Sequence, residues 1–89
     1  IINIYVFGQV RNPGALQVKM SKKITLLQAI AQAGGLAEGA SKRGITIKRK
    51  DRSGKEIKMK VNLKDIIKGK RPDIELKEGD VVYVPESIF

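Results

Sequence analysis

One segment with the full signature of a helix, residues 25–35, lies between segments that alternate like β-strands. Thr25 and Gln28 fit a capping box, in which the threonine hydroxyl accepts from the backbone of the third helical residue and the glutamine side chain bonds back to the threonine N–H. Apolar residues follow at helical spacing, and Gly34-Gly35 supplies the left-handed conformation that commonly ends a helix. We therefore expect one main helix of about ten residues, around which the rest of the chain must be arranged.

Two predicted strands precede this helix. Residues 1–8 carry apolar side chains at both odd and even positions, a pattern typical of a central strand with both faces at least partly buried. Residues 15–20 alternate, with Leu16, Val18 and Met20 on one face. Between them, Arg11-Asn12-Pro13-Gly14 predicts a turn, because Pro13 presets φ and Gly14 accepts a positive φ. The two segments should form an antiparallel hairpin.

A second hairpin follows the helix. Residues 45–50 and 56–61 alternate in hydrophobicity, and Asp51-Arg52-Ser53-Gly54 has the composition of a turn. A short helix is expected at 63–68, a tight turn at 77–80 and a last strand at 81–84, which Pro85 ends. This order predicts an α+β fold of the β-grasp type: a mixed sheet of about five strands with one main helix packed on one face and a short second helix. We expect residues 1–89 to form a single domain that is a fragment of a larger protein.

The positive charge is concentrated in one part of the chain. The net charge is +9, and residues 42–71 hold thirteen Lys and Arg against three Asp and Glu. On the predicted strand parity Lys48, Lys50, Lys58 and Lys60 share the outward face of the second hairpin. This face indicates an anionic ligand or neighbour, although lysines that protect a sheet edge from aggregation would give a similar pattern.

The residue types that most enzymes use are scarce. The chain has no histidine and no cysteine, which removes the commonest general base and the thiolate metal ligands. Gly34-Gly35 follows a helix, whereas glycines that hold a phosphate precede one. Apolar runs are much shorter than the roughly 20 residues of a membrane-spanning helix. We expect a non-catalytic binding domain with no cofactor, no metal and no catalytic residue.

Three motifs together resemble one known family. They are Val6-Phe7-Gly8-Gln9-Val10-Arg11-Asn12-Pro13-Gly14, then Thr25 to Gly35 ending in Ala33-Gly34-Gly35, then Ile74 to Pro85 with Lys77-Glu78-Gly79-Asp80 inside it. In this order they resemble the SLBB domain, a soluble ligand-binding β-grasp module found in bacterial polysaccharide export proteins. Similar modules also occur in DNA-uptake proteins. The basic hairpin and the insertion that contains Lys68-Gly69 resemble the export branch.

The resemblance implies a module of a capsular or exopolysaccharide export protein, in the periplasm and associated with the outer membrane. Its partners would be an acidic polysaccharide, other subunits of the same export protein in a ring, and an inner-membrane polysaccharide co-polymerase. The ligand- and partner-binding residues expected are those of the basic hairpin and of the first turn: Lys48, Arg49, Lys50, Arg52, Lys58, Lys60, Arg11 and Asn12.

Two other functions stay open from the sequence. Nucleic-acid binding fits the charge, but no aromatic residue lies among the lysines of residues 42–71, and stacking normally supplies about 1–3 kcal/mol per base. A purely architectural role, with the basic face against a partner, is the other. An acidic group near the C-terminus could then meet the basic hairpin of the next subunit: Asp73, Glu75, Glu78, Asp80 and Glu86.

Overall fold

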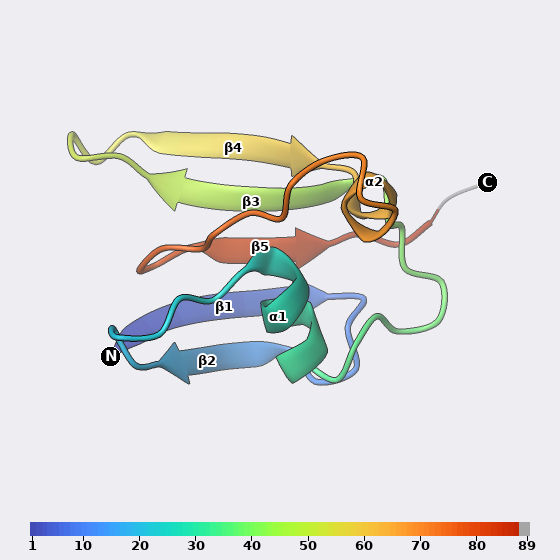
Figure 1. The fold of residues 1–89 in the computed structure, drawn as a ribbon, viewed down its shortest axis with the longest axis horizontal. Helices are drawn as coiled ribbons and strands as arrows, with labels where there is room; N and C mark the ends of the chain where they lie inside the picture. The colour runs from blue at the N-terminus through green and yellow to red at the C-terminus, as the bar shows by residue number, and fades with distance from the viewer. Residues whose placement is uncertain (88–89) are drawn as a thin grey trace.

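Five strands form one mixed sheet in the order β2-β1-β5-β3-β4 (Figure 1). Strands β1 (Ile2–Gly8) and β2 (Gly14–Val18) form one antiparallel hairpin, and β3 (Ile45–Lys50) and β4 (Glu56–Val61) form the other. The last strand, β5 (Val81–Val84), lies between the hairpins, parallel to β1 and antiparallel to β3. Within residues 1–87, the two hairpins therefore join in the sheet only through β5.

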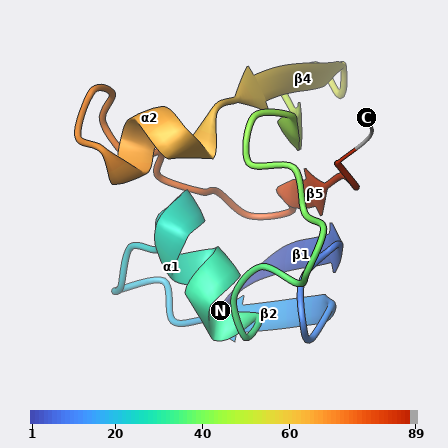
Figure 2. The same cartoon turned by 90° about the vertical axis from the view of Figure 1, so that its right-hand side faces the viewer.

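The computed structural model describes residues 1–87 of the chain, so Ile88 and Phe89 lie outside the described residues. Helices α1 (Leu26–Gln32) and α2 (Leu63–Ile67) both lie on the same face of the sheet, and neither covers the other face (Figure 2). The predicted α+β architecture, with one main helix and a short second one, is confirmed. Within residues 1–87 no helix has the length and apolar character needed to cross a membrane.

Both ends of α1 have the predicted chemistry. The Thr25 hydroxyl accepts from the Gln28 N–H at 3.3 Å, and the Gln28 side chain accepts from the Thr25 N–H at 3.0 Å. At the other end Gly35 donates to the Ile30 carbonyl at 2.9 Å and Gly34 to the Ala31 carbonyl at 3.1 Å, which is the Schellman pattern. Both glycines have positive φ. The helix has seven residues rather than ten because Thr25 and Ala33 are caps.

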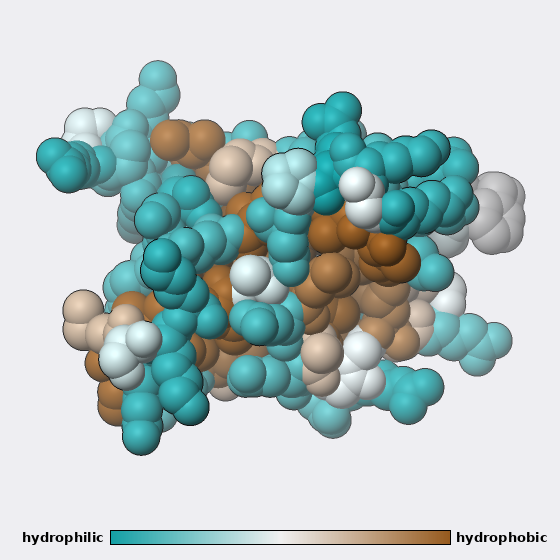
Figure 3. Space-filling model, viewed as in Figure 1, coloured by the Kyte–Doolittle hydropathy of each residue, from teal (hydrophilic) through white to brown (hydrophobic). Residues whose placement is uncertain are grey.

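The hydrophobic core lies between the sheet and the helices. Alternate residues of the three central strands point into it, together with the buried face of α1 and Leu63 of α2. Aliphatic side chains fill it: Ile4, Val6, Ile24, Leu26, Ile45, Ile47, Leu63, Val82 and Val84 are all fully buried. The helices are short, so apolar side chains remain visible on this face between margins of hydrophilic ones (Figure 3).

Three predictions in the first third of the chain were wrong in detail. The second strand ends at Val18, because residues 19–22 turn, and Met20 is 76% exposed instead of lying on the core face. Tyr5 and Phe7, expected to be partly buried on the second face of β1, are 44% and 42% exposed. The bend at Pro13 is wider than a tight hairpin turn, since the residues before it leave the sheet to pack against the end of α1.

Candidate ligand-binding face

In the described part of the chain, one face of the sheet carries no helix and presents side chains from all five strands. Residues paired across neighbouring strands point to the same side, so the register shows which side chains share this face. Successive residues of a strand point alternately to the core and to this face. In β1, Ile4 and Val6 point to the core, and Tyr5 and Phe7 point to this face. We call it the open face.

Two rows of side chains cross the open face at right angles to the strands. The first row runs from β1 to β4 and consists of Phe7, Tyr83, Thr46 and Lys60. The second row runs from β2 to β4 and consists of Ala15, Tyr5, Val81, Lys48 and Lys58. Each row thus has an aromatic residue on β1, Phe7 or Tyr5, and ends with lysine at the β4 edge.

The aromatic half of the open face is accessible and ordered by its own contacts. The rings of Phe7 and Tyr83 have centroids 5.1 Å apart and planes inclined by 44°, a favourable aromatic geometry. Tyr83 is 38% exposed, and with Phe7 and Tyr5 it leaves a group of ring surfaces in contact with water. Exposed apolar groups that lie together usually mark an interaction surface. Such rings can stack on the apolar face of a sugar or on a base.

The cationic half of the open face is provided by the second hairpin. Lys48 and Lys58 pair across β3 and β4, and Lys60 lies opposite Thr46, so three predicted residues are brought together. Lys50 lies opposite Glu56 near the tip, and Arg52 lies in the exposed turn beyond it. Only one of these lysines has an ion-pair partner within the described residues: Lys48 Nζ is 3.9 Å from a Glu56 carboxylate oxygen. The side chains of Lys48 and Glu56 are both solvent-exposed, so this ion pair contributes about 0–1 kcal/mol to the free energy of unfolding.

Arg49 lies apart from the lysines with which the sequence grouped it. It has the parity of Ile45 and Ile47, so its side chain is on the helix side of the sheet. Its Nη2 and Nε donate to the carboxylate of Asp80 at 2.8 and 3.0 Å, and Nη2 also donates to the Glu75 carbonyl at 3.2 Å. The hydrogen bonds to Asp80 raise the pKa of Arg49 above its ordinary value. Arg49 therefore holds the segment that leads into β5, and through it the position of Tyr83.

Asp80 is buried and therefore does not contribute to the acidic surface predicted near the C-terminus. Its side chain is fully buried and also accepts the Lys77 N–H at 2.8 Å, as expected for a turn aspartate. The carboxylate of Glu78 accepts from the backbone N–H of Asn3. No group of acidic or other ligand residues in 1–87 is arranged to hold a metal ion.

Arg11 and Asn12 lie in a loop that packs against the end of α1. The Asn12 N–H donates to the Ala33 carbonyl at 2.8 Å, and the Arg11 N–H donates to the Gly35 carbonyl at 3.1 Å. A β-carbon at Gly34 would lie 2.7 Å from the Asn12 side chain. The sequence motif at residues 6–14 and the one at residues 25–35 therefore pack against each other. The side chains of both loop residues are exposed, a few positions beyond Phe7.

Sequence reasoning missed the aromatic half of this face. The available signal was the alternation of Tyr5 and Phe7 with Ile4 and Val6, repeated by Tyr83 between Val82 and Val84. No local pattern shows that β5 pairs with both β1 and β3. This pairing places the rings on the same face of the sheet as the lysines of the second hairpin.

A family model described as the SLBB domain matches residues 3–84. The match covers all five strands and both helices, apart from Ile2, the first residue of β1. No curated protein matches the chain.

Proposed function

Because the chain belongs to the SLBB domain family, we propose that it is a non-catalytic binding and assembly module of a capsular or exopolysaccharide export protein. It acts in the periplasm in association with the outer membrane. Its ligand is an acidic polysaccharide, and its partners are further subunits of the export protein and an inner-membrane polysaccharide co-polymerase. The family membership supports a ligand-binding role, and the open face supports the choice of ligand.

The observation that carries this proposal is that exposed rings and lysines lie in the same two rows on one face of the sheet. A polysaccharide chain offers apolar ring faces for Phe7, Tyr83 and Tyr5, and acidic substituents for Lys48, Lys58 and Lys60. Neither half alone would be selective, since lysines attract any polyanion and aromatic rings accept any apolar face. Together they favour a ligand that is both cyclic and anionic.

The second candidate, a nucleic-acid-binding module of a DNA-uptake protein, is favoured by the same juxtaposition. Stacking of bases on exposed rings beside a basic strip is how many domains bind single strands. The sequence argument against it was the separation of aromatic residues from lysines, and the fold removes that separation on the open face. The two functions therefore need a direct competition.

The test is a titration of the ¹⁵N-labelled domain with three polymers at low and physiological salt. They are polygalacturonate, its fully methyl-esterified and therefore uncharged form, and oligo-dT. The proposal predicts amide shifts at Phe7, Tyr83 and Lys60 with polygalacturonate that persist at physiological salt, and weaker shifts with the ester. Tyr83→Ala should lower the affinity about tenfold, and Ile67→Ala, an exposed position on the helix side, should not. Tighter binding of oligo-dT at physiological salt would favour the second candidate, and no shift on the open face with either would refute both.

A further inference from the structure

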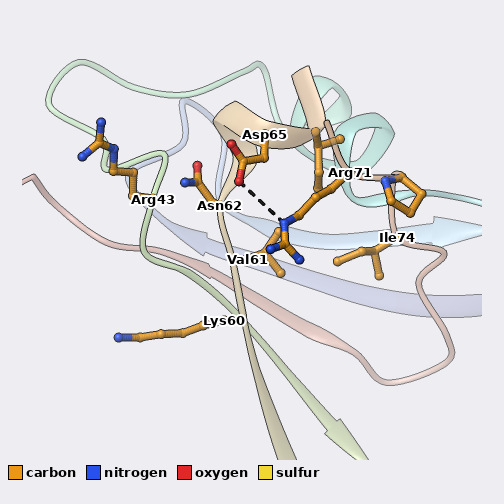
Figure 4. A pocket seen from close by; sticks show the side chains of 9 residues that line it. Arg43, Lys60, Val61, Asn62, Asp65, Arg71 and Ile74 are labelled. Carbon is orange, nitrogen blue, oxygen red and sulfur yellow. Dashed lines mark ion pairs between the residues drawn. The ribbon is translucent and has the colours of Figure 1, made fainter. Parts of the chain in front are cut away.

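A groove opens where β4 ends, between α2, the loop before β3 and the segment that follows α2 (Figure 4). Its volume is about 580 Å³, within the range of small-molecule sites. The loop before β3, the end of β4, α2 and the segment after α2 line it, with Asn62 at the start of α2. Val61 and Ile66 are buried and Ile74 is half-buried, so these three form an apolar floor.

The groove is positively charged at its rim. Among the described residues, Arg43, Lys60 and Arg71 line it against a single carboxylate, that of Asp65. Arg71 Nε lies 3.6 Å from this carboxylate, but the Arg71 side chain is 74% exposed and keeps most of its guanidinium surface. An apolar floor under a cationic rim is the same combination of chemistry as on the open face.

Lys60 belongs to both surfaces. It ends the first row on the open face, after Phe7 and Tyr83, and it also lines the groove. Figure 4 draws Lys60 and Arg43 on one side of the β4 chain, with Arg71 and Ile74 on the other. A path along the first row crosses three strand spacings, roughly 14 Å, from Phe7 to Lys60, where it reaches the groove at the sheet edge.

We propose that the groove is a second subsite for the same acidic polysaccharide, so that one chain crosses the open face and continues around the β4 edge past Arg43 and Arg71. This inference rests on the proposed function and adds that the affinity depends on the length of the oligosaccharide. A short oligosaccharide fills one surface, whereas a longer chain engages both, and linked contacts raise affinity because the second one forms intramolecularly.

The test is calorimetric titration of the full chain with oligogalacturonates of increasing length. We expect the affinity of the wild-type protein to rise at least about tenfold between the shortest and the longest oligomers. The double variant Arg43→Gln/Arg71→Gln should lose this rise and still bind the shortest oligomer as the wild type does. Lys19→Gln/Lys22→Gln, which removes the same charge from the turn after β2, should keep the rise. Thermal unfolding of each variant verifies that it is folded.

Amide shifts provide a second measurement. Ile74 and Asn62 should respond only to the longer oligomers, and Phe7 and Tyr83 to all of them. Length-independent binding at the open face, or an equal loss in the two double variants, would overturn the second subsite and leave the proposed function standing. Failure of every oligomer to perturb Phe7 or Tyr83 would instead overturn the proposed function, and the second subsite with it.

Discussion

Arg49 donates hydrogen bonds to both carboxylate oxygens of Asp80, whose side chain has no exposed surface. The pair spans from β3 to the residue just before β5, and the Asp80 backbone carbonyl accepts from Tyr5 of β1 at 2.9 Å. Asp80 thus links the turn before β5 to both neighbouring strands, to β3 through its carboxylate and to β1 through its backbone carbonyl. The pair is therefore a structural element, although the sequence suggested that Arg49 contacts a ligand.

Replacement of Arg49 by methionine should destabilise the domain. It would leave Asp80 buried without its charge partner, and removing one partner of such a pair costs about 3 kcal/mol in free energy of unfolding. Urea unfolding measures the loss. Lys50→Met, at the exposed neighbouring position, should change stability by less than about 0.5 kcal/mol. Equal effects of the two substitutions would show that the pair with Asp80 contributes nothing.

Gly8→Ala should be more harmful than Gly35→Ala, although both glycines have positive φ. A β-carbon at Gly8 would lie 2.2 Å from the Val84 carbonyl oxygen, whereas one at Gly35 would meet nothing within 4 Å. Both substitutions incur about 1–2 kcal/mol of left-handed strain, and Gly8→Ala should add about 1–3 kcal/mol because β1 and β5 must separate. Denaturant midpoints measure the difference, and equal midpoints would contradict it.

Thr25→Ala should remove one cap hydrogen bond of α1. The expected loss is about 1 kcal/mol in free energy of unfolding, the usual value for a helix N-cap. Thr25→Ser keeps the hydroxyl that accepts the Gln28 N–H and should retain most of that stability. Urea unfolding compares the variants, and hydrogen exchange at the Gln28 amide locates the change. A serine variant as unstable as the alanine variant would mean that the methyl group, and not the hydroxyl, matters at this position.

The hairpin turn should loosen in acid. The Asp51 carboxylate accepts from the Ser53 hydroxyl at 2.6 Å and from the Ser53 and Lys55 amides at 2.9 Å each. The Ser53 hydroxyl, followed by these amides, holds the pKa of Asp51 below its ordinary 3.8. A lowered pKa means that the turn is stabilised above pH 3.8 and loses this contribution as the pH falls through the lowered value.

The amide signals of Ser53 and Lys55 should accordingly stay constant from neutral pH to about pH 4, and move below it. Asp51→Asn should abolish this movement. A transition in these signals well above pH 4 would contradict the assignment to Asp51.

Local sequence patterns predicted the parts of this fold that depend on neighbours in the chain. Hydrogen bonds between residues a few positions apart determine the Thr25 and Gln28 cap, the Gly34-Gly35 end of α1 and the Asp51–Gly54 turn. Local composition and spacing therefore predict these features. Met20 was misplaced because an alternating pattern does not show where a strand leaves the sheet.

The candidate site depended on pairing that local patterns do not contain. The parity of Lys48, Lys58 and Lys60 was predicted correctly, because a hairpin is a local structure. Arg49 was assigned to the ligand group on charge alone, and only the position of Asp80 shows why a cation alternates with Ile45 and Ile47. The rings of Tyr5 and Tyr83 join the lysines through two long-range strand pairings.

The central place of β5 has a consequence for the order of folding. Residues 1–61 can form two local hairpins, but within the described fold these hairpins have no strand pairing with each other. Until residues 81–84 insert between them, β1 and β3 each present an unpaired inner edge, and such edges invite pairing with other chains. We therefore expect the domain to be most prone to aggregation before β5 inserts, because that single step covers both edges.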